Sequence, residues 1–230
     1  MIRPPRQLTL DWPHQPSFAR EDFLAAPSNR EALRAIDQWP NWASRMLLLV
    51  GPEGAGKSHL ASLWAGTANA TVAHGESLDL ISLELGVQTS ALLIENVDRI
   101  GKAEDRLFHL VNAALQNGVW TLLTARAAPE AWDLKTPDLL SRLRLAPVIR
   151  LEAPDIELTE AVLFKLFSDR QLQVEPRVVA YIAVRIERSL GKARKLVDTL
   201  DREALALGRC VTRAMARELL RESASEDDAP

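Results

Sequence analysis

The sequence predicts an α/β domain built on a parallel sheet, followed by a smaller unit made only of helices. Between residue 18 and about residue 150, short apolar runs alternate with stretches of helical periodicity. Strands that alternate with helices and are too apolar to face water are typical of a parallel sheet covered on both sides. From residue 155 onward only helical spacing remains, and 230 residues suffice for one α/β core with a smaller appended unit.

In the α/β part, residues 18–154, the expected elements follow one another at short intervals. Residues 1–17 precede them and contain four prolines but no helical period, which predicts an extended arm. Strands are expected at 46–50, 91–94, 119–124 and 148–151, with a weaker one at 71–74. Helices are expected at 29–39, 57–68, 78–85 and around 107–115.

The helical part, residues 155–222, carries a signal for each of four helices. These signals are Asp155 as an N-cap, Pro176 in a first turn, a periodic run over 190–207, and Thr212 as the N-cap of a helix ending near Leu220. Residues 223–230 are rich in acidic side chains, and we expect them to form a disordered tail.

Composition narrows the class of protein. Apolar content of 47% and charged content of 26% are those of an ordinary globular protein, and a net charge of −3 disfavours direct DNA binding as the main activity. Cys210 is the single cysteine, which excludes an intramolecular disulfide and a cysteine-rich zinc site. Because there is no long apolar run and no signal-peptide core at the N-terminus, we expect a cytoplasmic protein without membrane contact.

A phosphate-binding loop follows the first strong strand. The segment reads Gly51-Pro52-Glu53-Gly54-Ala55-Gly56-Lys57-Ser58 and opens the helix expected at 57–68, with His59 in its first turn. Backbone N–H groups of such a loop converge on phosphate oxygens at the positive end of the helix. Lys57 can reach the β and γ phosphates and the Ser58 hydroxyl can bind Mg²⁺. The sequence therefore predicts a nucleoside phosphate site.

An acidic residue ends the strand at 91–94. Glu95 stands where a P-loop ATPase places its metal-side acid, and we expect it to hold Mg²⁺ directly or through water. The next residue is Asn96, whose amide cannot take a proton from water, so weak self-hydrolysis is expected. Asp98 is an alternative base, but we expect it to cap a turn instead.

The order and spacing of these elements resemble the AAA+ domain of the bacterial replication initiator DnaA. The resemblance is carried by Asp22-Phe23-Leu24 ahead of Ser28-Asn29, by the P-loop with His59-Leu60, and by the helical lid. It is closer still to the short DnaA relatives of the Hda family, and it covers residues 7–222. The resemblance implies bound ADP or ATP with Phe23 and Leu24 in the adenine pocket, although a plain core role is equally expected for these two. It leaves no room for DnaA's dedicated DNA-binding domain.

The N-terminal arm resembles the clamp-binding peptide of Hda proteins. It reads Gln7-Leu8-Thr9-Leu10-Asp11-Trp12, and the resemblance implies the sliding clamp, the β subunit of DNA polymerase III, as a partner. Gln7 can hydrogen-bond at the rim of a pocket while Leu8 and Leu10 bury apolar surface, worth about 1.5–3 kcal/mol for each fully buried Leu. The alternative is an arm that packs on its own domain.

Three further positions follow from the resemblance. Arg142, in Leu140-Ser141-Arg142-Leu143, corresponds to the arginine finger that DnaA and Hda project into a neighbouring subunit's nucleotide. Its nearby competitor is Arg144, and either is alternatively a solvated helix arginine. Thr124 corresponds to sensor 1 but lacks the acidic residue that follows in DnaA. Arg194 is our assignment for sensor 2, with Lys192 as the alternative cation.

The tryptophans and histidines are not assigned to the site, apart from His59. The six tryptophans are far apart in sequence, so we expect no stacking platform, and Trp64 is expected in the core. The four histidines lack metal-ligand spacing and are expected to be structural or on the surface.

Together these features predict a regulatory AAA+ adaptor that binds adenine nucleotide and the DNA-loaded clamp. Its partner is expected to be DnaA, whose bound ATP it would cause to be hydrolysed, and a homodimer is also possible. Two alternatives stay open: an ATPase that loads a helicase or another DNA machine, and a small-molecule P-loop kinase. Asn96 disfavours the first, and the helical lid with Arg142 disfavours the second.

Overall fold

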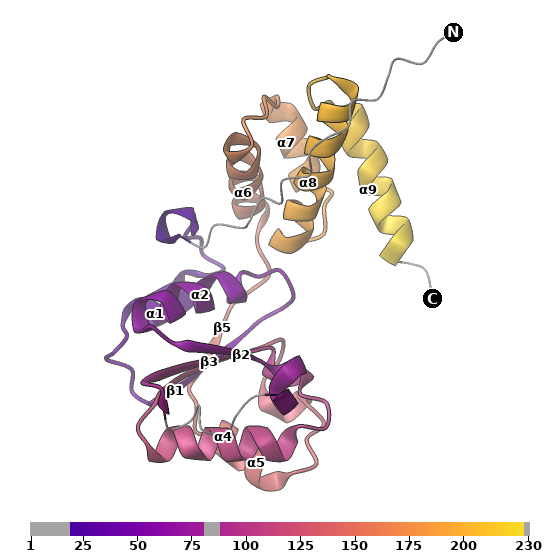
Figure 1. Cartoon of the computed structure of the whole chain (residues 1–230). Coiled ribbons are helices and arrows are strands. Elements are labelled where there is room, and N and C mark those ends of the chain that lie inside the picture. Colours follow the sequence, from indigo (N-terminus) through magenta and orange to yellow (C-terminus); the bar gives the residue numbers. More distant parts are fainter. Residues whose placement is uncertain (1–18, 81–87, 228–230) are drawn as a thin grey trace. The chain divides into compact units, whose positions relative to one another are not determined.

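The computed structural model describes residues 19–80 and 88–227, which form two compact units divided between Ala153 and Pro154 (Figure 1). The predicted arm 1–17, with Gln7, Leu8 and Leu10, lies outside the described residues, as do residues 81–85 of the predicted helix 78–85. The start of that helix, residues 78–80, belongs to a 3₁₀ turn, η2 (Gly75–Leu80).

The first unit contains a five-stranded sheet in which all neighbouring strands are parallel. The spatial order is β2-β3-β4-β1-β5. The strands are β1 (Met46–Val50), β2 (Thr71–His74), β3 (Ala91–Glu95), β4 (Trp120–Ala125) and β5 (Val148–Arg150). All five predicted strands are present, and the predicted parallel sheet is confirmed.

Helices lie on both faces of this sheet (Figure 1). The helices of this unit are α1 (Arg30–Asp37), α2 (Lys57–Ala68), α4 (Glu104–Gln116) and α5 (Pro137–Leu143). Short 3₁₀ turns are η1 (Arg20–Asp22), η3 (Val97–Arg99) and η4 (Pro129–Ala131). Because every strand ends at the same edge, each loop that follows a strand contributes to one common rim.

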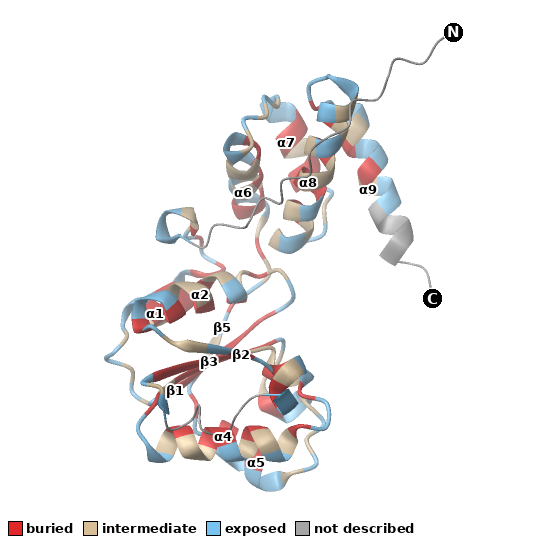
Figure 2. Ribbon diagram, viewed as in Figure 1, coloured by how far each residue is buried: buried red, intermediate tan, exposed pale blue. Residues whose placement is uncertain are grey.

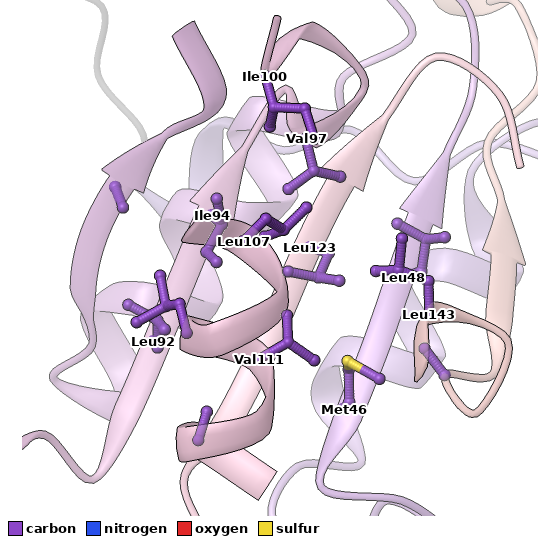
Figure 3. Packing of buried hydrophobic residues seen from close by; sticks show 14 of the residues in the cluster. Met46, Leu48, Leu92, Ile94, Val97, Ile100, Leu107, Val111, Leu123 and Leu143 are labelled. Carbon is purple, nitrogen blue, oxygen red and sulfur yellow. The ribbon is translucent and has the colours of Figure 1, made fainter. Parts of the chain in front are cut away.

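Burial explains why these runs form strands inside a layered core. Every residue of β1 is buried, and alternate side chains enter different clusters because successive residues of a strand point to opposite faces. Leu48 packs with Ile94, Leu123 and the α4 residue Leu107 on one face, as Figure 3 shows. Buried residues fill the centre of each unit in Figure 2.

On the opposite face four tryptophans that lie far apart in sequence pack against one another in the core. Trp42 stacks on Trp64, with ring centroids 5.4 Å apart and an interplanar angle of 22°. Trp39 and Trp120 add edge-to-face contacts, and Trp64 is buried as expected. The segment after α1, helix α2 and strand β4 bring these residues together, which sequence spacing does not reveal.

The second unit consists of four helices around one apolar cluster. They are α6 (Ile156–Asp169), α7 (Pro176–Ala183), α8 (Leu190–Leu207) and α9 (Arg213–Asp227). Asp155 accepts the Leu158 N–H at 2.7 Å and Thr212 accepts the Met215 N–H at 3.3 Å, so both predicted N-caps are present.

The last helix corrects the predicted tail. Helix α9 continues to Asp227, where we expected disorder from residue 223. The segment contains no glycine or proline that would stop the helix, so acidic character alone did not end it. None of the helices in the described ranges is long and apolar enough to span a membrane.

Candidate nucleotide-binding site

The P-loop joins the end of β1 to the start of α2 in a conformation that requires glycine. Gly54 and Gly56 have φ of 75° and 102°, in the left-handed region that other residues rarely adopt. A Cβ atom at Gly51 would lie 2.4 Å from the Leu151 carbonyl oxygen, so a side chain there would displace the strand edge. The backbone conformation at Gly54 and Gly56 and the close approach at Gly51 therefore require glycine even when no ligand is bound.

Lys57 is buried within the loop. Its ammonium donates hydrogen bonds to the carbonyl oxygens of Gly51 at 2.7 Å and Pro52 at 2.9 Å. Burial lowers the pKa of Lys57, while the nearby Asp98 carboxylate acts to raise that pKa. The ammonium is therefore held at the mouth of the loop by neutral acceptors, which a phosphate oxygen can replace with a charge-assisted bond.

Two carboxylates at the end of β3 have oxygens with no hydrogen-bond donor among the described residues. Oε1 of Glu95 and Oδ1 of Asp98 are both buried and unpartnered. The second Glu95 oxygen lies 3.7 Å from Nδ1 of His74. A buried carboxylate oxygen without a donor destabilises the fold unless a cation or water reaches it. Glu95 is therefore suited to bind a divalent ion.

The donor set suits Mg²⁺ rather than a metal held by protein alone. Within residues 19–80 and 88–227, no group of three or more His, Cys, Asp or Glu side chains is arranged to hold a metal. Mg²⁺ usually keeps several waters and binds one or two carboxylates together with substrate phosphates. Glu95 fits that arrangement, with the exposed Ser58 in the first turn of α2 as the hydroxyl ligand.

Asp98 does not act as the cap of a local turn that we expected. Its Oδ2 accepts the backbone N–H of Arg126, just past the end of β4, at 3.1 Å. The carboxylate therefore ties the loop after β3 to the loop after β4. This link depends on β3 and β4 being neighbours in the sheet, which residue spacing could not indicate.

Asn96 and Thr124 connect the same two strands. The Asn96 backbone N–H donates to Oγ1 of the buried Thr124 at 3.0 Å. Asn96 itself is left-handed, with φ of 53°, and its amide Nδ2 donates to Oε1 of Glu76 at 3.3 Å. The Asn96 side chain is thus bound to a surface carboxylate, while the Thr124 hydroxyl has a fixed place between the strand ends.

An ion-pair network at the loop was missed by the sequence analysis. Nη2 of Arg126 lies 2.6 Å from Oε2 of Glu53 in the P-loop, and Nη2 of Arg99 lies 3.7 Å from the same oxygen. Arg99 also pairs with Glu76 at 3.5 Å. The hydrogen bond from Arg126 to Glu53 is the main reason the pKa of Arg126 is raised. The only sequence signal was the place of Arg126 two residues beyond Thr124.

Phe23 and Leu24 lie in the segment that precedes α1. The Phe23 ring meets the His59 ring edge-on, with centroids 5.2 Å apart, and so contacts the first turn of α2. Leu24 is half-buried, and its carbonyl accepts Nδ2 of Asn29 at 2.9 Å. The structure brings Phe23 to the start of the P-loop helix and includes it in the apolar core, so its core role is present and its adenine contact stays a prediction.

The two candidate finger arginines differ in their surroundings. Arg142 is exposed on α5, and its guanidinium has no hydrogen bond or ion pair with the residues that the structure describes. Nε of Arg144 lies 3.0 Å from Oε1 of Glu130. Leu139 and Leu143 are fully buried and fix the helix that carries Arg142.

The proposed sensor 2 belongs to the helical unit. Arg194 is half-buried in the first turns of α8, whose N-cap Ser189 accepts the Lys192 N–H at 3.3 Å. The Lys192 side chain pairs with Glu187. The two units are described separately, so contact of either cation with a nucleotide stays a prediction.

Comparison with solved structures identifies the fold. Domain III of the replication initiation protein DnaA from Thermotoga maritima superposes with a TM-score of 0.78 and 22% identity, over 92% of this chain and 98% of that one. AMPPCP-bound DnaA from Aquifex aeolicus gives a TM-score of 0.67 and 15% identity, over 80% of this chain and 64% of that one. No protein-family model matches the chain.

A branch migration motor also shares the fold. The RuvB Holliday junction branch migration motor from Thermotoga maritima superposes with a TM-score of 0.65 and 17% identity, over 89% of this chain and 72% of that one. These superpositions cover most of this chain, which has a five-stranded parallel sheet with the P-loop after β1 and a helical unit after the sheet. The chain therefore shares the fold of DnaA domain III and of RuvB.

Proposed function

We propose that this protein is a regulatory AAA+ adaptor of the Hda type. It binds ADP or ATP with Mg²⁺, attaches to the DNA-loaded sliding clamp, and promotes hydrolysis of the ATP bound to DnaA. Conversion of the initiator to its ADP form would prevent a second round of initiation. The observation that carries the proposal is Arg142, an exposed arginine on α5 whose guanidinium has no partner among the described residues.

Nucleotide binding rests on the P-loop itself. Lys57 is held where phosphate oxygens would replace the carbonyls of Gly51 and Pro52, and left-handed Gly54 and Gly56 support a loop whose N–H groups would bind phosphate. Glu95 and Ser58 would hold Mg²⁺, which would neutralise phosphate charge when bound. Phe23 supplies apolar surface at the start of α2, where the adenine ring is expected.

Weak hydrolysis by the protein itself follows from Asn96. An amide cannot accept a proton from water, and here its Nδ2 is already engaged by Glu76. The bound nucleotide would then act as a structural ligand that fixes the docking surface. ADP and ATP both serve that purpose.

Arg142 supports action on a neighbouring ATP. A guanidinium is always charged and its planar fork can bind phosphate oxygens in pairs, so an unpaired arginine on a fixed helix is suited to stabilise charge in trans. An arginine finger supplied by a partner is worth about 10³–10⁵ in rate. Arg144 is less suited because Glu130 already neutralises it.

The clamp-binding role rests on the peptide containing Gln7, Leu8 and Leu10, which lies outside the described residues. Two apolar side chains give modest affinity, and attachment to an assembled clamp with DnaA nearby would raise the effective concentration. A homodimer is part of the same proposal, since AAA+ surfaces that meet a DnaA subunit can also meet a second copy of this chain.

The decisive experiment is single-turnover hydrolysis of ATP preloaded on DnaA, with DNA-loaded clamp present. We expect the wild type to stimulate hydrolysis and Arg142→Ala to lose at least about a thousandfold of that stimulation. The matched control is Arg144→Ala, which removes an arginine that is already paired and should stimulate normally. If both variants lose stimulation equally, Arg142 is not the arginine that acts in trans. The same conclusion follows if folded, nucleotide-bound wild type does not stimulate hydrolysis.

A second candidate function is an ATPase that loads or drives a DNA machine. It is favoured by Asp98, whose buried Oδ1 has no donor among the described residues and whose charge acts on Lys57. A carboxylate can take the proton from attacking water, which Asn96 cannot. Release of phosphate by the purified protein alone, abolished in Asp98→Asn, would favour this function over the adaptor.

A further inference from the structure

We infer that Glu53 and Arg126 set the preference of this site between nucleoside diphosphate and triphosphate, Glu53 acting against a terminal phosphate and Arg126 in its favour. The inference deepens the proposed function, because it rests on the P-loop binding a nucleotide. The P-loop motif alone does not indicate whether the site retains a diphosphate or a triphosphate.

The first step is the position of Arg126. Its backbone N–H donates to Asp98, and the preceding residue, Ala125, accepts the Gly51 N–H at 3.2 Å. Val50 pairs with Ala125 across the sheet. The arginine is therefore fixed directly beside the first residue of the P-loop, with only its side chain free to change partner.

The second step is the charge at the loop. Glu53 stands in the P-loop four residues before Lys57, and one of its oxygens receives the Arg126 guanidinium at 2.6 Å. Arg99 approaches the same oxygen at 3.7 Å. A carboxylate and a phosphate offer the same kind of oxygen acceptor to a guanidinium, so Glu53 competes with phosphate for both arginines.

The third step is proximity to the terminal phosphates. The Lys57 ammonium, which reaches the β and γ phosphates in such loops, is close enough for Glu53 and Arg126 both to act on its pKa, in opposite directions. Charges that act on this ammonium act on the phosphates beside it. A γ-phosphate adds negative charge to the side that Glu53 already occupies, whereas a diphosphate leaves the Glu53–Arg126 pair undisturbed.

A pair that sets nucleotide preference differs measurably from an ion pair that serves only stability. The side chains are 77% and 44% exposed, and an exposed pair that served only stability would contribute little. Loss of either partner would then leave the ratio of the two nucleotide affinities unchanged. A selectivity pair requires instead that the two substitutions shift this ratio in opposite directions.

The test is calorimetric titration of the full chain with Mg·ADP and with Mg·AMPPCP, a triphosphate analogue that resists hydrolysis. In Glu53→Gln the ratio of the AMPPCP Kd to the ADP Kd should fall by about three- to tenfold, and in Arg126→Gln it should rise by a similar factor. Arg126→Lys keeps the charge and should stay near wild type. At about 1 M ionic strength both shifts should shrink, since the Debye length is then about 3 Å.

The control pair is Glu130→Gln and Arg144→Gln, an exposed carboxylate and arginine in contact at 3.0 Å outside the loop, whose loss should leave the ratio unchanged. The inference would be overturned, and the proposed function left standing, if both test variants still bind ADP and their ratio of AMPPCP Kd to ADP Kd is unchanged. A shift of this ratio in the same direction in both variants would have the same meaning. Failure of the folded wild type to bind either nucleotide would overturn both the inference and the proposed function.

Discussion

At the scale of single residues, Lys57 combines two opposing requirements. Its ammonium must be charged to hold phosphate, yet burial lowers its pKa, with the Asp98 carboxylate acting to restore it. The carbonyl oxygens of Gly51 and Pro52 hold the group in place without supplying a full negative charge. The site therefore keeps a cation that gains much more from a phosphate than an exposed lysine would.

This arrangement predicts a pH dependence of nucleotide affinity. Above the lowered pKa the Lys57 ammonium loses its proton, so ADP affinity should fall by about tenfold per pH unit as pH rises towards the ordinary value of 10.5. For folding without ligand the sign is opposite. The unfolded chain holds this proton more tightly, so the contribution of Lys57 to the free energy of unfolding rises with pH over the same window.

Titration with ADP across this pH range measures the first effect. The matched control is Lys57→Arg, which stays charged throughout and should show a flatter profile. Identical profiles for the two proteins would mean that another group controls the affinity.

Residue positions that depend on one local pattern were predictable, and those that depend on sheet order were not. Strand, glycine loop and helix follow one another in sequence, so the positions of Lys57 and Glu95 at strand ends could be predicted. The pair Glu53–Arg126 exists because β1 and β4 are neighbours, although β2 and β3 lie between them in the chain. In the sequence, Glu53 and Arg126 look like ordinary surface charges, so their pairing could not be predicted.

At the scale of elements, a carboxylate of α4 adds polar contacts to the apolar packing between α4 and α5. Glu104, in the first turn of α4, accepts the Lys135 N–H at 3.0 Å and the Thr136 N–H at 2.9 Å, immediately before α5 begins. Burial acts to raise the pKa of Glu104, but these donors and the Thr136 hydroxyl outweigh it, so the pKa lies below 4.5. The same contact fixes the start of the helix that carries Arg142.

Removal of this carboxylate should destabilise the unit that contains it. We expect Glu104→Ala to lower the free energy of unfolding by about 1–2 kcal/mol at neutral pH, because two backbone donors lose their acceptor. Since the folded pKa is lowered, the stabilisation is present above 4.5 and is lost as pH falls through the folded value. Urea unfolding at several pH values measures the difference.

The control for that measurement is Asp105→Ala. Asp105 is an exposed acid in the same first turn of α4, so it shares the interaction with the helix dipole without the contacts to residues 135–136. An equal loss in both variants would assign the effect to the dipole rather than to the attachment of α5.

Element existence followed from periodicity, and the errors concern contacts between elements and one helix end. The periodic run over 190–207 matches α8 to the residue, because apolar spacing and the Ser189 cap agree there. The tryptophan contacts join the segment after α1, helix α2 and strand β4, so no window of sequence contains them. The end of α9 was missed because acidic residues are compatible with a helix as well as with disorder.

At the scale of the whole molecule, the proposal requires the nucleotide site and the clamp peptide to act as separate parts. Replacing both Gln7 and Leu8 with alanine should abolish clamp binding and leave the ADP Kd unchanged, because the peptide loses its hydrogen bond at the pocket rim together with the burial of one leucine, worth about 1.5–3 kcal/mol. Clamp pull-down and ADP titration of the same preparation measure the two properties.

A double variant of matched chemistry serves as the control. Gln38 and Leu80 are both exposed in the α/β unit, Leu80 to 88%, so their replacement by alanine removes the same side-chain types elsewhere. Undiminished pull-down by the Gln7, Leu8 variant would show that the arm is not the attachment site.

The contacts among Trp39, Trp42, Trp64 and Trp120 give the molecule a useful optical division. Every tryptophan of the described residues lies in the α/β unit, and the chain's single tyrosine, Tyr181, lies in the helical unit between the guanidinium groups of Arg185 and Arg213. The emission of the five described tryptophans therefore follows unfolding of the α/β unit, with Trp12 removed as Trp12→Phe, and tyrosine absorbance follows unfolding of the helical unit. Bound nucleotide would delay the first signal through mass action, and any delay of the second would measure how strongly the two units unfold together.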